Sequence, residues 1–391
     1  MSSIPVLVFL VLRAVVAGDF LAFTLSVAVA LDNALLSQAH FALSDSILIT
    51  LCLLSILVFV DLYSRALNAT RASLFVWVIW GVLTAAAALV KLTGAFVLIL
   101  VPLYAVKLLS AGHMRRATLF GLAFSVSFVT TTAAVWQLHF SLIPNLDPKN
   151  DFDISVIHRQ ILEGEYRPDP VNRFVIQFRD AMIFIPKFHN GVPQLDLSNP
   201  DEIGSPWYQW PFGGRTIPYR WDTLDGRTYR YIYLIGNPVT WLISLLGVVL
   251  GSAVAVSDIL FRYLTEHRRH WIYIFSLLYW AYMLPIMFIR RVMYLYHYLP
   301  ALIIGIIMFG ILFDQLRTIS WKTKRHIVCV SLVGVIATFW VYKPFTFYEP
   351  LTADQFQHRN VWTPWDLRCV NCRAMPGNRI RSKQQRTVQR R

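Results

Sequence analysis

Residues 291–315 read RVMYLYHYLPALIIGIIMFGILFDQ, and this stretch sets the class of fold. From residue 299 onward the run is almost wholly apolar. Its length approaches the roughly 20 residues that an α-helix needs to cross a bilayer. The run therefore predicts a membrane-spanning helix, and the two Gly residues within it are tolerated in such helices.

Similar apolar runs recur along the chain on both sides of this stretch. We expect one partial span at 4–12 and about eight complete spans. The candidate runs for the complete spans lie at 16–31, 47–63, 73–89, 92–110, 118–136, 232–257, 271–288, 299–315 and 326–342. The fold class predicted from them is all-α, a multi-pass transmembrane helical bundle with one long polar loop.

The composition agrees with a membrane protein. The 391 residues are 56% hydrophobic and only 15% charged, and the mean hydropathy is +0.51. Soluble domains carry about 25% charged residues, so these values exclude a disordered chain and argue against a soluble enzyme. The net charge of +14 does not indicate nucleic acid, because half of it lies in residues 343–391 and most of the rest lies in short loops.

The basic loops predict how the chain is oriented. Short loops rich in Lys and Arg favour the cytoplasm, and under this count they fall on one side, at Arg13, Arg65–Arg71, His113–Arg116, Arg262–Arg269 and Arg317–Arg325. Four regions follow: an N-terminal membrane region at residues 1–136, a translocated aromatic-rich loop at 137–230, a four-span region at 231–342 and a basic tail at 343–391, also translocated.

The first stretch that suggests chemistry is DNALLSQAHFALSD, residues 32–45. Asp32, Asn33, His40 and Asp45 lie between two predicted spans on the translocated side. Carboxylates near a membrane are costly unless they are paired or used, so a functional role is reasonable. Plain helix capping by Asp32, Asn33 and Asp45 is the competing interpretation, and both interpretations can hold for different residues.

Two further stretches carry aromatic and cationic side chains. GSPWYQWPFGGRTIPYRWD, residues 204–222, offers Trp207 and Trp210 for stacking on a sugar and Arg215 for a phosphate. An interfacial aromatic belt without a ligand explains it equally well. In PIMFIRRVMYLYHYLPAL, residues 285–302, Arg291 suits an anionic headgroup or phosphate. The alternatives are that Arg291 snorkels to lipid and that His297 is structural.

Together these stretches resemble the protein O-mannosyltransferase family. DNALLSQAHFALSD is similar to the family's DNALV-QSRFILLD, VKLTGAF (90–96) to VKWTGLF, GSPWYQWPF to SHPW-WPL, YLIGNPVTWL (233–242) to YL-GNPV-WW, and RVMYLYHYLPAL to RETFLYHYLPAL. Any one match is weak, but five in family order over nearly the whole chain are strong.

The resemblance implies a GT-C-type fold and transfer of mannose from a polyprenyl- or dolichyl-phosphate donor to Ser or Thr hydroxyls of translocated proteins. It implies donor-side roles for Asp32, Asn33, His40, Asp45, Arg291 and His297, with Arg291 the best candidate for the lipid phosphate. Trp207, Trp210 and Arg215 become sugar or acceptor-loop candidates. Membrane lipid and a dimer partner are further expected partners. No cofactor, metal site or nucleic-acid partner is expected.

Several features depart from the family pattern. The family's catalytic Asp-Glu pair lies before the point at which this chain starts, so we expect an N-terminally truncated member and assign no catalytic residue. His40 replaces the family's Arg, and Ser205 replaces its His. The loop 137–230 shows no sign of the β-trefoil module of eukaryotic members, which favours a bacterial-type protein of the plasma membrane over one of the endoplasmic reticulum.

Three other hypotheses stay open at this point. The chain could be a catalytically silent short paralogue that binds lipid phosphate or partners an active subunit. It could be a different GT-C enzyme, such as an aminoarabinose transferase acting on a lipid glycan. A transporter is the third, and the long aromatic loop speaks against it.

Overall fold

Apolar helices make up most of the structure, a computed structural model in which residues 3–15, 18–41, 43–68, 70, 72–142, 154–199, 201–223, 227–262, 264, 266–316 and 318–368 are described. Within these ranges seven helical segments are long and apolar enough to cross a membrane. An eighth is counted if the bent pair Asp19–Ala30 and Asn33–His40 is one span. The multi-pass helical fold is therefore confirmed.

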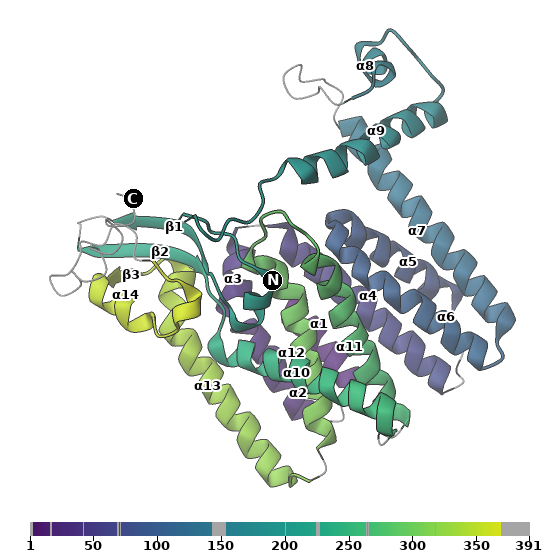
Figure 1. Cartoon of the computed structure of the whole chain (residues 1–391). Helices are drawn as coiled ribbons and strands as arrows, with labels where there is room; N and C mark the ends of the chain where they lie inside the picture. The colour runs from purple at the N-terminus through teal and green to yellow at the C-terminus, as the bar shows by residue number, and fades with distance from the viewer. Residues whose placement is uncertain are drawn as a thin grey trace.

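The N-terminal half is a layer of helices around α4, shown in purple and blue in Figure 1. Its elements are α1 (Ser3–Val15), α2 (Asp19–Ala30), α3 (Asn33–His40), α4 (Ser44–Leu67), α5 (Leu74–Val90), the 3-10 helix η1 (Leu92–Ile99), α6 (Leu100–Ser110) and α7 (Met114–Leu142). The predicted partial span is α1, and α1 and α5 are both shorter apolar helices than a full span needs.

The loop expected between the first spans is mostly helical. α2 and α3 meet at an angle of 51°, and Asp32 caps α3 at the bend by accepting a hydrogen bond from the Leu35 amide at 2.9 Å. Because α3 holds Asn33 and His40 on one short rigid segment, these candidate residues occupy fixed positions.

The C-terminal membrane region packs closely through small residues. It consists of α10 (Pro238–Phe261), α11 (Glu266–Met287), the 3-10 helix η3 (Leu295–Tyr298), α12 (Leu299–Gln315) and α13 (Trp321–Phe347). A Cβ atom on Gly247 would lie 2.0 Å from the Gly305 carbonyl oxygen, so α10 and α12 approach closely only because glycine stands there. The Ser244 hydroxyl donates to the Leu302 carbonyl at 2.9 Å across this contact.

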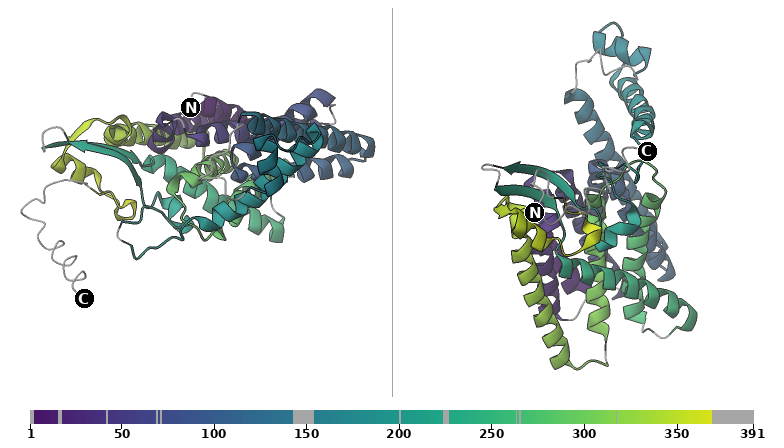
Figure 2. Two further views of the ribbon diagram at one scale, coloured as in Figure 1. Left: turned by 90° about the horizontal axis from the view of Figure 1, so that it is seen from above. Right: turned by 60° about the vertical axis from the view of Figure 1, so that its left-hand side comes forward.

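One end of the bundle, called the site face below, carries the polar elements. It holds α3, the helices α8 (Val156–Glu163) and α9 (Pro170–Gly191), the 3-10 helix η2 (Trp207–Phe212), the strands β1 (Ile217–Thr223), β2 (Thr228–Leu234) and β3 (Pro350–Thr352), α14 (Ala353–Arg359) and the 3-10 helix η4 (Thr363–Trp365). α8 and α9 project beyond the tip of α7, and the sheet lies at the other side of the same end (Figures 1 and 2).

The antiparallel sheet, with strand order β1-β2-β3, is an addition to the predicted all-α fold. Tyr229, Tyr231 and Tyr233 alternate along β2 and bury one face of the sheet. They pack on Phe345 and Phe356 from the C-terminal segment. The sheet thus joins the predicted loop 137–230 to the predicted tail.

The predicted boundaries between the four regions need correction for this reason. The boundary between 230 and 231 falls inside β2, and the span expected at 232–257 begins at Pro238. The described residues 343–368 of the predicted tail end α13 and form β3, α14 and η4. Residues 369–391 of that tail lie outside the described residues.

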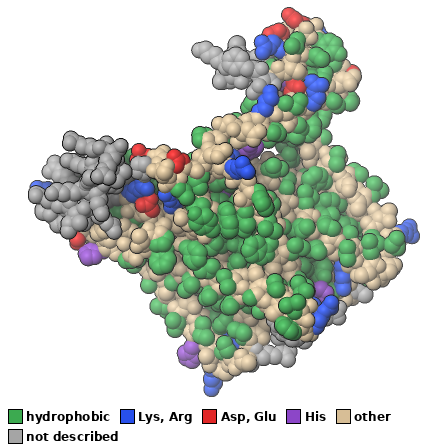
Figure 3. Space-filling view, in the orientation of Figure 1, with side chains coloured by type: hydrophobic (Ala, Val, Ile, Leu, Met, Phe, Trp, Pro, Cys, Tyr) green, Lys and Arg blue, Asp and Glu red, His purple; other side chains and the backbone are tan. Residues whose placement is uncertain are grey.

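The opposite end of the bundle gathers basic loops. Arg13 pairs with Asp19 at 2.7 Å, and the Lys324 ammonium donates to the Asp314 carbonyl at 2.8 Å. Arg325 stacks over the Phe20 ring at 5.8 Å, which brings the first and last of these loops together. In Figure 3 hydrophobic side chains dominate the middle of the visible face, and Lys and Arg lie at its margins. This is the pattern of a membrane-embedded bundle.

Candidate functional site

A half-buried ion pair lies on the site face. The Lys91 ammonium lies 2.5 Å from Asp45 Oδ1. Asp45 stands in the first turn of α4, and Lys91 is the extended residue at which α5 ends and η1 begins. η1 packs against α5 at Gly94, where a Cβ atom would lie 2.2 Å from the Ala87 carbonyl oxygen. This close approach fixes the backbone next to Lys91.

Aromatic rings line the other side of Lys91. Its ammonium lies 5.2 Å from the centroid of the Tyr296 ring, within the range of a cation–π contact. Tyr296 stacks on His297 with centroids 4.4 Å apart, and His297 in turn stacks on the buried Trp210 at 6.1 Å. The Trp210 indole donates to the Ser205 hydroxyl at 2.8 Å. Two sequence candidates, His297 and Trp210, thus belong to one wall.

Arg291 supplies a second cation beside the same wall. Its backbone forms an isolated bridge with Gln194, and it lies near enough to Tyr296 and His297 to interact electrostatically with both. Within the described residues the Arg291 guanidinium has no hydrogen bond or ion pair. Lys91 and Arg291 therefore both lie near the Tyr296–His297 pair, and among the described residues Lys91 is paired with a carboxylate while Arg291 is not.

A chain of neutral groups holds Asp45 from the other side. Gln38 donates its amide Nε2 to Asp45 Oδ2 at 2.8 Å, and the Tyr219 hydroxyl donates to Gln38 Oε1 at 2.7 Å. Burial raises the pKa of Tyr219 above its usual range, with the neighbouring Tyr296 and Asp45 adding to the effect. The phenol therefore stays protonated and acts as a donor.

Asp32 and Asn33 lie deeper and away from this ion pair. Asp32 is fully buried, and its Oδ2 accepts hydrogen bonds from the Asn237 amide and the Trp241 indole, both at 3.0 Å. Asn33 donates to the Thr346 hydroxyl at 2.9 Å. These contacts join α3 to α10 and α13. Asp32 thus caps the start of α3 and joins it to α10, and its donor-side role stays a prediction.

The remaining sequence candidates lie at the rim. His40 is exposed, and its ring meets Phe347 edge-on at 5.4 Å. Trp207 is exposed on η2 and contacts Tyr208. Arg215 adopts a positive φ of 56° and donates to the Gly204 carbonyl at 3.0 Å. None of the contacts of these three residues reaches Lys91 or Asp45 within the described segments of the chain.

Sequence reasoning did not include Lys91, Gln38, Tyr219 or Tyr296 among the candidates. Lys91 and Gln38 both lay inside quoted family stretches. Lys91 is also a lone cation between two apolar runs, which is itself a signal of function. Tyr219 belongs to the aromatic stretch 204–222, but its contact with Gln38 gives no sequence signal, because it spans 181 residues.

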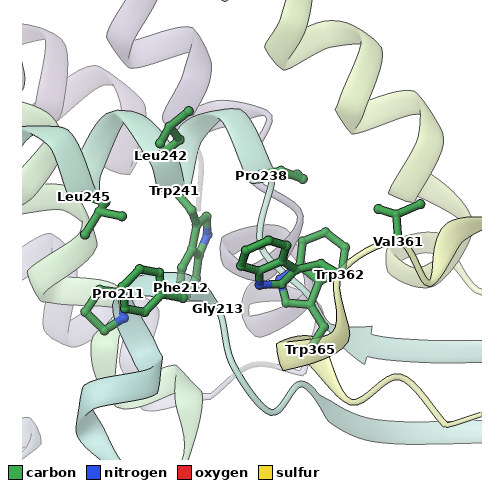
Figure 4. A pocket seen from close by; sticks show the side chains of 11 residues that line it. Pro211, Phe212, Gly213, Pro238, Trp241, Leu242, Leu245, Val361, Trp362 and Trp365 are labelled. Carbon is green, nitrogen blue, oxygen red and sulfur yellow. The ribbon is translucent and has the colours of Figure 1, made fainter.

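An apolar pocket lies between η2, the start of α10 and the segment around η4 (Figure 4). Its volume is ≈ 410 Å³, and no charged residue lines it. Phe212 and Trp241 stand on one side and Trp362 and Trp365 on the other, below the start of α10. Such a pocket suits hydrocarbon and does not suit a phosphate. Among the described residues, no group of three or more His, Cys, Asp and Glu could hold a metal ion.

Comparison with known families matches two segments of the chain. Residues 1–138 match the family model for dolichyl-phosphate-mannose-protein mannosyltransferase. Residues 184–365 match the model for the C-terminal four-transmembrane region of protein-O-mannosyltransferase. The chain belongs to the protein O-mannosyltransferase family. It is a multi-pass integral membrane member, because its apolar helices are long enough to span a bilayer.

Individual relatives of this mannosyltransferase-family chain are distant. "Dolichyl-phosphate-mannose--protein mannosyltransferase 1" of Saccharomyces cerevisiae is 26% identical over 194 residues, which cover 44% of this chain and 22% of that protein. "Protein O-mannosyl-transferase 2" of Drosophila pseudoobscura pseudoobscura is 27% identical over 194 residues, covering 37% and 25%. The matched region thus spans about a quarter of each curated relative.

The fold agrees with a solved mannosyltransferase structure over nearly the whole chain. The S. cerevisiae protein O-mannosyltransferase Pmt1-Pmt2 complex bound to the sugar donor contains a chain that superimposes with a TM-score of 0.74. The match covers 98% of this chain and 81% of that one, at 13% sequence identity. The GT-C-type architecture expected from the sequence is therefore confirmed.

Proposed function

We propose that this chain transfers mannose from a polyprenyl- or dolichyl-phosphate donor to Ser or Thr hydroxyls of translocated proteins. The observation that carries the proposal is the pair of cations, Lys91 and Arg291, near the Tyr296–His297 stack, of which Lys91 is paired with Asp45. A net positive site at the end of a membrane bundle suits a lipid phosphate. The names of the relatives support mannose as the sugar.

The main requirement of this reaction is to stabilise the negative charge on the departing lipid phosphate. The acceptor hydroxyl oxygen forms a bond to the anomeric carbon of mannose. The bond from that carbon to the phosphate oxygen breaks, and its electron pair stays on the lipid phosphate. Lys91 and Arg291 stabilise the charge that develops there. The hydroxyl proton passes to a base, and we assign that role neither to Asp32 nor to Asp45, because both oxygens of each already accept hydrogen bonds or an ion pair.

The aromatic loop provides the second half of the proposal. Trp207 offers an exposed indole face on which a sugar or an acceptor side chain can stack. Trp210 acts from within the wall by holding the His297 ring parallel to its own. Arg215 keeps η2 and the following turn in place through the Gly204 carbonyl.

We propose that the protein lies in a bacterial plasma membrane. The described residues of the segment 137–230 form the end of α7, the helices α8 and α9, η2 and most of a hairpin, and this supports a bacterial-type member without the module of eukaryotic enzymes. The matched solved structure is of a Pmt1-Pmt2 complex. We propose that this chain likewise associates with a second subunit.

Transfer from a defined donor tests the proposal. Membranes that contain the chain are given polyprenyl-phosphate mannose labelled in the sugar and a Ser/Thr-rich peptide. We expect label on this peptide and none on a matched peptide in which every Ser and Thr is Ala. Absence of label on both peptides, with donor still bound by the protein, contradicts mannosyl transfer.

That last outcome supports a second candidate function, which is binding of lipid phosphate without transfer. The observation that favours it is that Asp32 and Asp45, two buried carboxylates on the site face, already accept hydrogen bonds and are not available as a general base. Donor bound with the affinity of an enzyme but never consumed is the result that this candidate predicts.

A further inference from the structure

A line of three hydrogen bonds runs from the sheet to Lys91, the residue proposed to bind the lipid phosphate. The Tyr219 hydroxyl donates to Gln38 Oε1 at 2.7 Å, Gln38 Nε2 donates to Asp45 Oδ2 at 2.8 Å, and Lys91 Nζ donates to Asp45 Oδ1 at 2.5 Å. The four residues come from β1, α3, α4 and the end of α5. The line thus connects elements that are far apart in sequence.

The chemistry of these groups gives the line one direction. Lysine can only donate, so Asp45 serves it as an acceptor. The end of the Gln38 amide that faces Asp45 must then be the NH₂ group, and the amide oxygen must face Tyr219. Only a donor fits opposite that oxygen, and the Tyr219 hydroxyl is one. Reversal of the amide would place its oxygen against the carboxylate.

The strand is shaped to deliver this hydroxyl. The register of β1 against β2 shifts between Pro218 and Arg220, so Tyr219 is the extra residue of a bulge. A bulge re-aims the side chain that it carries. The Tyr219 ring also meets Phe41, just beyond α3, with centroids 4.7 Å apart. Both features direct the side chain towards α3.

Burial makes the hydroxyl hard to replace. Gln38 is 1% exposed and Asp45 is 4% exposed. Water therefore has little access to the Gln38 oxygen if the hydroxyl is removed, and a buried acceptor without a donor is unfavourable. The amide then gains freedom to rotate, and Asp45 loses the contact that fixes its second oxygen.

We propose that Tyr219 is a positioning residue, which holds Lys91 in place for the lipid phosphate through Gln38 and Asp45. The inference rests on the proposed role of Lys91 in binding the donor. It gives the sheet of the translocated segment a direct influence on donor affinity, although no atom of Tyr219 needs to touch the donor.

The test compares single and double variants of the full chain in detergent, with polyprenyl phosphate as the probe. We expect Tyr219→Phe to weaken binding ~3- to 10-fold, the range that one buried hydrogen bond supports. In the Gln38→Ala background the same substitution should cause no further loss, because the line is already broken. Tyr233→Phe is the matched control, since it removes a buried hydroxyl of the same sheet that bonds the Arg368 carbonyl.

The outcomes separate this inference from the proposed function. Equal weakening by Tyr219→Phe in both backgrounds, or by Tyr233→Phe, shows a general structural effect and overturns the positioning role. Wild-type affinity in Tyr219→Phe overturns it as well, while leaving the proposed function standing. A wild-type chain that does not bind polyprenyl phosphate overturns the proposed function and the inference with it.

Discussion

Asp32 and Asp45 bracket the same short helix, α3, yet they serve different regions of the molecule. Asp32 accepts hydrogen bonds from the neutral N–H groups of Leu35, Asn237 and Trp241, and it joins α3 to α10. Asp45 pairs with the Lys91 cation and lies near the aromatic wall of the site. A buried carboxylate surrounded by neutral donors stabilises architecture, whereas one paired with a partly exposed cation positions a charge for use.

The largest expected effect comes from removing the cation on the Asp45 side. Lys91→Met should lower mannosyl transfer by ~10²–10³-fold, the usual cost of losing one group that stabilises developing negative charge. Initial rates with polyprenyl-phosphate mannose measure it. Lys343→Met is the matched control, because Lys343 also pairs with a carboxylate, Glu349, at 2.6 Å. If both variants lose mannosyl transfer equally, the Lys91–Asp45 pair has no role in transfer beyond that of any other ion pair.

On the Asp32 side the expected loss is of stability. Asp32→Asn keeps the size of the side chain but replaces one acceptor oxygen by an NH₂ group, which cannot accept a hydrogen bond from the N–H groups of Leu35, Asn237 or Trp241. We expect the free energy of unfolding to fall by about 1–3 kcal/mol, because at least one buried N–H is left without a partner. Thermal denaturation in detergent measures the change.

Asp19→Asn provides the control for that experiment. Asp19 forms an exposed ion pair with Arg13, which is worth about 1 kcal/mol or less. The comparison fails if Asp32→Asn melts at the wild-type temperature while losing donor binding, since Asp32 would then act in the site.

A smaller effect is expected from the second cation. Arg291→Ala should weaken binding of polyprenyl phosphate ~10-fold or more, as expected for loss of a hydrogen bond to a charged group, with the protein still folded in membranes. Arg290→Ala, which changes the neighbouring exposed residue, should bind as the wild type does. Unchanged affinity in Arg291→Ala would leave Lys91 as the phosphate ligand on its own.

The smallest effect is expected at the rim. His40→Arg restores the residue type of the family stretch at an exposed position whose ring contact is with Phe347. An exposed charge contributes about 1 kcal/mol at most, so activity should change no more than about fivefold. Abolished transfer in this variant would show that His40 has a role that a permanent cation cannot fill.

The helical architecture followed from hydropathy alone, because each span needs a long apolar run and little else. The sheet did not, although Tyr229, Tyr231 and Tyr233 repeat with a period of two in TYRYIYL. Their neighbours on β2 are also partly apolar, so hydropathy predicts a polar loop and the start of a span there. Period two within the loop of a membrane protein is the pattern that indicates the strand.

The site was predicted only in part, for a related reason. Asp45, His297, Trp210 and Arg291 stood out by type and by family resemblance. Lys91 stands in the sequence as a lone cation between two apolar runs, but its pairing with Asp45 is seen only once α4 and the end of α5 bring the two side chains together. The Tyr219–Gln38 hydrogen bond joins segments 181 residues apart. It also depends on a bulge in β1 that no local sequence pattern predicts.

The central claim is that the site face binds the phosphate of a lipid carrier through Lys91 and Arg291, and the effect of that phosphate on affinity tests it most directly. Polyprenyl phosphate and the matching uncharged polyprenol are titrated against the wild-type chain and against Lys91→Met/Arg291→Ala in the same detergent. We predict that the wild type binds the phosphate form at least ~10-fold more tightly and that the double variant binds both forms alike. Equal affinity of the wild type for the two lipids would contradict the account.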